Sequence, residues 1–168
     1  MVVNTTKIII VFTLMLCFVA CLKPVTFPDE PTIEYVSFEA NSDSGILTFS
    51  FTDGNGDIGL DQEFLEPPYE PGSFYHHNLY IGYYEMVDGV LTRGTADPDG
   101  NNSSNYDTVS FLYRIEDLTP IGQNKALKGS ISITIEPFYY NPNSLSSDSI
   151  QYDILLIDRD LNHSNLLL

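Results

Sequence analysis

The sequence predicts an all-β protein, an antiparallel β-sandwich of about seven strands. Beyond residue 32, apolar and polar side chains alternate with a period of two, as they do in strands buried on one face. The alternating segments are short, and polar turns rich in Gly, Asn and Asp separate them. No segment has the pattern of a helix of ordinary length, and only residues 116–127 could hold a turn or two.

The first half of the domain supplies four of these strands. Residues 33–40 form the first candidate, and in the second, residues 45–51, the large apolar side chains stand at alternate positions. Residues 79–87 and 90–93 flank the pair Asp88-Gly89. An Asp-Gly pair between apolar runs predicts a tight hairpin, because both turn positions need positive φ.

The second half supplies three more candidate strands, at residues 107–115, 129–138 and 149–157, with an apolar side chain at every second position. The polar stretch 94–105 is expected to be a loop. Among sandwiches, the immunoglobulin-like version fits this spacing of strands. It would lack the buried disulfide and Trp of antibody domains, since the chain contains no Trp.

The N-terminal segment predicts export and a lipid anchor. Residues 8–20 are apolar except for Thr13, and this run is shorter than the span of about 20 residues that crosses a bilayer. It ends in the small residue Ala20, and Cys21 follows. The arrangement resembles a bacterial lipoprotein signal, in which signal peptidase cuts before a cysteine that carries diacylglycerol. We therefore expect a signal peptide at 1–20, a lipidated Pro-rich tether at 21–31 and a β-sandwich domain at 32–168.

An ordinary cleaved signal with an incidental cysteine is the alternative. Cys17 does not fit the cleavage site because Leu16 is too large, and Phe18 stands where leucine is more usual. Lys7 is the one basic side chain ahead of the apolar run. With lipidation at Cys21, each buried methylene of an acyl chain adds about 0.8 kcal/mol to membrane attachment. We then expect a cell-envelope protein on the periplasmic or surface face of the outer membrane.

The charge excludes a nucleic-acid-binding protein. The chain carries 7 basic and 23 acidic residues, which give a formal net charge of −16. Loss of the leader removes Lys7 and no acid, so the mature chain would be still more acidic. Such a chain repels phosphate backbones and anionic lipid headgroups, and it attracts cations. The lipid is therefore the expected membrane contact.

Asp53, Asn55 and Asp57 stand at alternate positions of a glycine-rich loop directly after the second predicted strand. Oxygen side chains in this arrangement can converge on one point, and Ca²⁺ takes about six to eight oxygen ligands. The loop is not an EF-hand, because Ile58 and Phe64 occupy positions that need Gly and Glu. In the structural alternative, the Asp and Asn side chains cap their own backbone. Nothing nearby completes a coordination shell, which favours that alternative.

A second acidic loop, DRDLNHSN, begins at Asp158 after the last predicted strand. Asp158 or Asp160 could face the first loop and complete a cation site. An Arg159–carboxylate clamp with turn capping is the structural alternative, and it is favoured. In a sandwich whose successive strands run in opposite directions, all even-numbered strands end at one end of the molecule, its pole, and all odd-numbered strands end at the other. Both acidic loops therefore lie together if residues 90–93 are only a hairpin tail, and at opposite ends if they are a full strand.

Tyrosines gather in the middle of the sequence, and Tyr80, Tyr83 and Tyr84 are the candidate ligand-binding residues among them. Exposed aromatic rings can stack on sugars. The alternative is that tyrosines at alternate strand positions are half-buried core with a hydroxyl at the rim, which is the more frequent arrangement.

No catalytic constellation is visible in the sequence, since Gly-x-Ser-x-Gly is absent and the mature cysteine carries lipid. We therefore expect a non-enzymatic binding or structural module, with Ca²⁺ as a candidate stabilising ion and a protein or glycan as the unidentified ligand. One alternative is a glycan-binding component of a polysaccharide-uptake system. Another is a glycoside hydrolase, for which the many carboxylates single out no pair.

Four segments carry a resemblance. In their order behind a lipoprotein leader, FTDGNGDIGL, NLYIGYYEMVDG, RIEDLTP and DRDLNHSN together resemble uncharacterised lipoproteins of the Bacteroidota. The resemblance covers most of the mature chain and implies an immunoglobulin-like domain in the periplasm or at the cell surface, with no assigned activity. Such proteins usually continue past the last motif into another strand, whereas this sequence ends at Leu168.

Overall fold

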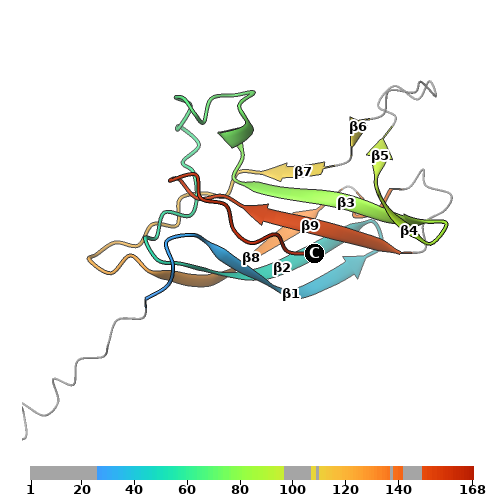
Figure 1. Cartoon of the computed structure of the whole chain (residues 1–168), viewed down its shortest axis with the longest axis horizontal. Coiled ribbons are helices and arrows are strands. Elements are labelled where there is room, and N and C mark those ends of the chain that lie inside the picture. The colour runs from blue at the N-terminus through green and yellow to red at the C-terminus, as the bar shows by residue number, and fades with distance from the viewer. Residues whose placement is uncertain (1–25, 97–106, 109, 137, 142–148) are drawn as a thin grey trace, which may run out of the picture.

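The fold is all-β, with seven strands in two antiparallel sheets that face each other as in a sandwich (Figure 1). The computed structural model describes residues 26–96, 107–108, 110–136, 138–141 and 149–168. The predicted leader and Cys21 lie outside these residues, as does most of the predicted loop 94–105. Within the described part, no helix is both long and apolar enough to cross a membrane.

The three-stranded sheet has the order β1-β2-β8, formed by β1 (Thr32–Asn41), β2 (Ser44–Asp53) and β8 (Leu127–Ile135). β2 is central, and buried and half-buried residues alternate along its whole length. This strict period of two places Leu47 and Phe49 on the inner face, where they are 2% and 0% exposed.

The four-stranded sheet is built around β3 (Leu79–Val87). β9 (Ile150–Leu156) pairs with one edge of β3, and β7 (Ser110–Tyr113) and β4 (Val90–Arg93) pair with successive halves of the other edge. A separate pair of short strands, β5 (Thr95–Ala96) and β6 (Asp107–Thr108), extends beyond this sheet.

The core lies between the sheets and contains branched aliphatic and aromatic side chains from both. Apolar side chains with no exposed surface come from β2, β3, β8 and β9 and from the loop after β2. The buried cluster comprises Ile33, Leu47, Phe49, Phe51, Ile58, Leu79, Ile81, Ile131, Ile135, Ile154 and Leu156.

The predicted hairpin is confirmed. β3 and β4 have the predicted bounds, and Asp88 and Gly89 have φ values of 50° and 79°, as a turn with two positive φ angles requires. β4 pairs only with the last four residues of β3, so it is a hairpin tail. Residues 116–126 contain no helix; instead a short 3₁₀ helix, η1 (Phe74–His76), forms in a segment where none was expected.

Because β4 is a hairpin tail, β2 and β9 end at the same pole of the sandwich, as the parity argument required (Figure 1). The backbone N–H of Arg159, after β9, donates a hydrogen bond to the carbonyl of Asp57, after β2, at 3.3 Å. The two acidic loops are therefore in direct contact.

Candidate metal centre

β2 ends in an aspartate that belongs to its buried face. Asp53 is the last residue of the strand, and it is 0% exposed. Its Oδ2 accepts a hydrogen bond from the backbone N–H of Asp57 at 3.0 Å. Burying a carboxylate is costly unless hydrogen bonds, an opposite charge or a metal ion compensates it. One backbone donor is a small compensation for a charge in this position.

The loop after β2 is anchored by Ile58 and Leu60, which are 0% and 2% exposed. Gly56 has a φ of +74°, and a Cβ there would lie 2.0 Å from the carbonyl oxygen of Lys125. Only glycine fits both the backbone angle and the close approach. The glycine thus lets the chain fold back, so that Asp57 lies over the end of β2.

Asp158 reaches the same place from the other sheet and is 2% exposed. Its Oδ1 accepts a hydrogen bond from the backbone N–H of Asn162 at 2.7 Å, and its Oδ2 accepts one from the Asn162 side-chain amide at 2.9 Å. The backbone N–H of Asp160 donates to Oδ2 of Asp57 at 3.1 Å. The first two contacts fix the turn after β9, and the third joins it to the loop after β2.

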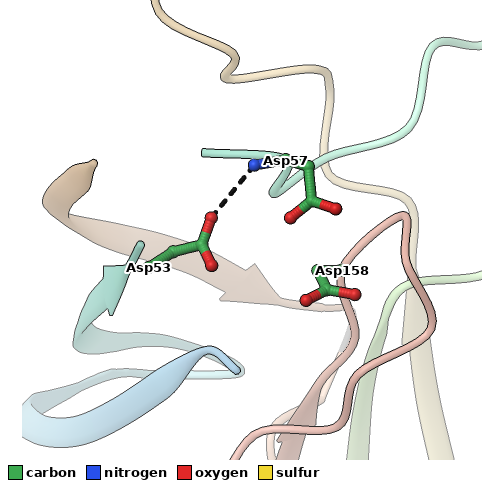
Figure 2. A group of neighbouring side chains, drawn as sticks. All are labelled: Asp53, Asp57 and Asp158. Carbon is green, nitrogen blue, oxygen red and sulfur yellow. Dashed lines mark hydrogen bonds between the residues drawn. The ribbon is translucent and has the colours of Figure 1, made fainter. Parts of the chain in front are cut away.

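The three carboxylates converge. One oxygen from each of Asp53, Asp57 and Asp158 lies within 4.8 Å of the others, and Figure 2 shows the side chains turned toward a common point. Oδ1 of Asp53 and Oδ1 of Asp57 are buried, and no described residue donates a hydrogen bond to either. A buried acceptor without a donor is rare in proteins, and unoccupied ion positions are one of its causes.

The electrostatics of the cluster are repulsive. Burial, followed by the charges of Asp158 and Asp160, raises the pKa of Asp57 to about 6. Burial also raises the pKa of Asp53 and of Asp158, with repulsion between these carboxylates acting in the same direction. Like charges disfavour their own ionised forms in this way when no cation lies between them.

Asn55 and Asp160 lie at the margin of the cluster. The side-chain amide of Asn55 donates to Oδ2 of Asp160 at 3.3 Å, and Asp160 is exposed to solvent. Oδ1 of Asn55 is buried and receives no hydrogen bond from a described residue. The structure thus brings together all five residues that the sequence suggested, with three at the centre and two at the edge.

Arg159 forms its ion pair outside the cluster. Its Nη1 lies 2.6 Å from Oδ1 of Asp117 and donates to the carbonyl of Gly59 at 3.1 Å. Although partial burial opposes the shift, hydrogen bonds from Thr119 and Arg159 lower the pKa of Asp117 to about 2. Both arrangements considered for this loop therefore occur together: Arg159 clamps a carboxylate, and Asp158 caps its turn while facing the first loop.

The donor set suits a hard divalent cation. All candidate ligands are oxygens, and among the described residues this is the group of His, Cys, Asp or Glu side chains close enough to hold a metal ion. Ca²⁺ accepts irregular oxygen shells supplied by loops, whereas Mg²⁺ demands near-octahedral geometry and Zn²⁺ prefers nitrogen and sulfur. Asp53, Asn55 and Asp57 each contribute a buried oxygen that receives no hydrogen bond from a described residue.

Much of the terminal motif is structural. The hydroxyl of Ser164 accepts a hydrogen bond from the N–H of Leu156 at 3.0 Å. The side chain of Asn165 accepts from the N–H of Ile33 at 2.8 Å and donates to its carbonyl at 3.0 Å. None of these roles was predicted: Asn165 lies 132 positions from Ile33 and Asp117 pairs with a distant arginine, and no local pattern marks Ser164 as the partner of Leu156.

The structure separates the three candidate tyrosines. Tyr80 and Tyr84 are half-buried on the outer face of the four-stranded sheet. Tyr83 points into the core, where it is 1% exposed, and its hydroxyl accepts a hydrogen bond from the N–H of Asn141 at 3.0 Å. Burial raises its pKa to about 12. Tyr83 is therefore a core residue and is not available to a ligand at the surface.

The described residues form a small all-β protein with two antiparallel sheets and a group of three aspartates, able to hold a metal ion, at one pole. Other proteins give no guide to what this group does. Comparison of the chain with protein-family models, with curated proteins and with solved structures gives no match.

Proposed function

We propose that this chain is a non-enzymatic, lipid-anchored module of the cell envelope whose immunoglobulin-like β-sandwich is stabilised by Ca²⁺. The observation that carries the calcium proposal is the convergence of Asp53, Asp57 and Asp158, with buried oxygens that no described donor satisfies. An ion held there would join the loop after β2 to the loop after β9. It would thereby tie one sheet to the other.

The chemistry of the cluster supports a stabilising role. Three carboxylates in a shielded position repel one another, and a divalent cation replaces this repulsion by coordination. The strongly acidic chain raises the local concentration of cations around the site.

The lipid anchor is supported by the sequence, in which an apolar leader ends in Ala20 and Cys21 follows. We expect radiolabelled palmitate to enter the protein in the cell. The label should be lost in Cys21→Ala and kept in Cys17→Ala, which changes the other cysteine. Label that persists in Cys21→Ala would contradict this anchor.

Thermal unfolding of the full-length protein, after chelation and again with added Ca²⁺, tests the ion. Binding to the folded state alone stabilises by about 2.7 kcal/mol when free Ca²⁺ is about a hundred times its dissociation constant. We expect Ca²⁺ to raise the Tm of the wild type and of Asp43→Asn, an exposed aspartate at the opposite end of β2. Asp57→Asn should lose the response, and equal Tm values of the wild type with and without Ca²⁺ would refute the proposal.

A further inference from the structure

A groove of about 210 Å³ crosses the outer face of the four-stranded sheet, away from the aspartate cluster. One side of it is aromatic and the other is polar, and a glycine of β3 lies between them. Its lining includes Phe74, Tyr80, Gly82, Arg93, Ser110 and Asp153.

The aromatic side is a fixed platform. The rings of Phe74 and Tyr80 stack with centroids 4.9 Å apart and planes 15° apart. The hydroxyl of Tyr80 lies within hydrogen-bonding reach of the carbonyls of Phe74 and His77, and its one proton, donated to either, holds the stack in place. Phe74 remains 54% exposed, so an apolar surface of this platform faces solvent.

The polar side is equally fixed. Nη1 of Arg93 lies 3.4 Å from Oδ2 of Asp153, and its Nη2 donates to the hydroxyl of Ser110 at 3.0 Å. The hydroxyl of Tyr84 donates to the same Oδ2 at 2.8 Å, and the Arg93 guanidinium lies 5.1 Å from the centre of the Tyr84 ring. Oδ1 of Asp153 takes part in no hydrogen bond with a described residue, so it can accept one from a ligand.

Gly82 makes room for the polar side of the groove. A Cβ at this position would lie 2.0 Å from Oδ1 of Asp153 and 2.8 Å from Nη2 of Arg93. Any other residue would therefore displace the polar pair. The absence of a side chain lets the Asp153 carboxylate and the Arg93 guanidinium lie directly over Gly82, beside the ring stack.

We propose that this groove binds a neutral saccharide, with a sugar ring against Phe74 and its hydroxyls on Asp153 and Arg93. A ligand that is apolar on one face and rich in hydroxyls at its edges matches both sides, and few, well-placed polar groups in an apolar site give orientation. The strongly acidic chain disfavours an anionic ligand, and Arg93 already neutralises Asp153 against a cationic one. The inference goes beyond the proposed function and is independent of the Ca²⁺ site and of the lipid.

Affinity electrophoresis of the full-length protein in a polyoxyethylene detergent tests the proposal. The gels would contain dextran, mannan, xylan or laminarin as neutral probes and alginate as an anionic one. We expect at least one neutral polysaccharide to retard the wild type. Phe74→Ala and Asp153→Asn should weaken the apparent affinity about fivefold to tenfold, the range expected for one aromatic or charged contact.

Phe138→Ala is the matched control, because Phe138 is also an exposed phenylalanine but lies outside the groove. It should be retarded like the wild type, and so should Asp57→Asn, which separates this result from the calcium test. Retardation by none of the four neutral polysaccharides, or by alginate alone, would overturn the proposal. Equal retardation of the wild type and both groove variants would also overturn it.

Discussion

At the scale of single residues, Asp57 is the carboxylate on which the repulsion between the aspartates of the acidic loops has the clearest effect. Its carboxylate is shielded from water and faces Asp158 and Asp160, so its pKa rises to about 6 from the ordinary 3.8. In calcium-free protein, a proton is the cation available to relieve this repulsion. Stability without Ca²⁺ should therefore depend on pH in a direction that is fixed by this shift.

The sign follows from linkage. Because the pKa of Asp57 is higher in the folded than in the unfolded state, the folded state binds more protons in the interval between the two values. The free energy of unfolding of calcium-free protein should therefore rise as the pH falls from about 7 to about 5. Urea unfolding of chelated protein at these two pH values measures the change.

Asp57→Asn is the control, because it removes the titrating group and keeps the size of the side chain. We expect a smaller rise in stability on acidification in this variant than in the wild type. The shifts of Asp53 and Asp158 have the same direction, so part of the rise should remain. An identical pH dependence of both proteins would contradict the role given to Asp57.

At the scale of elements, β1 is held at both its edges, although among the described strands it pairs with β2 alone. β2 covers one edge, and the side chain of Asn165 takes the place of a neighbouring strand for Ile33 on the other. A side-chain amide combines N–H donors with a carbonyl acceptor, so it can make the same pair of hydrogen bonds as a backbone peptide. The C-terminal segment is thereby attached to the first strand.

Replacing Asn165 should loosen this attachment. Asn165→Ala leaves the N–H and C=O of the buried Ile33 without these partners, which costs about 1–3 kcal/mol for unsatisfied buried groups. Asn165→Asp keeps the acceptor and should lose less. Gln123→Ala, which changes an exposed amide in a loop, should stay within about 0.5 kcal/mol of the wild type. Chemical unfolding of the three variants measures these differences.

The strands were predictable because their signals are local. The alternation in β2 and the Asp88-Gly89 turn depend on neighbouring residues, and both appear in the structure as expected. Residues 116–126 adopt no helix because they pair with another loop: the N–H of Leu118 donates to the carbonyl of Ile58 in the loop after β2. That partner lies 60 positions earlier in the sequence, and no local pattern reveals it.

The same distinction applies to the candidate site. The acidic loops could be placed together from strand parity, once 90–93 was taken as a hairpin tail. The burial of Asp53 could also be predicted from the sequence. Asp53 follows Phe49 and Phe51 at the next alternate position of β2, so its side chain belongs to the same buried face. The ion pair of Arg159 with Asp117 was not, since both belong to loops whose courses depend on the assembled sandwich.

At the scale of the whole molecule, the two sheets share a core, and charged groups of the acidic loops join them at one pole. The acidic loops form this junction, while the β1–β2 and β3–β4 turns lie at the other end (Figure 1). An ion between Asp53, Asp57 and Asp158 would therefore order one end of the sandwich and leave the other unchanged.

Hydrogen exchange tests whether the effect of the ion is confined to one end of the sandwich. Added Ca²⁺ should slow exchange of backbone amides in residues 54–60 and 157–162 together, because one ion would restrain both loops. Amides of the turns at residues 42–43 and 88–89 serve as internal controls and should exchange at unchanged rates. Slowing that is uniform over the molecule, or confined to one acidic loop, would contradict an ion that joins the sheets.

The chain enters the sandwich beside the acidic loops. Its position there is fixed by a hydrogen bond of 2.7 Å from the N–H of Gly54 to the carbonyl of Pro28. Seven positions separate Pro28 from Cys21, so an extended tether reaches about 25 Å at most. With acyl chains on Cys21, the aspartates would face the bilayer and the hairpin turns would point outward. Divalent ions that gather at anionic headgroups would then be delivered to the end of the molecule that can hold them.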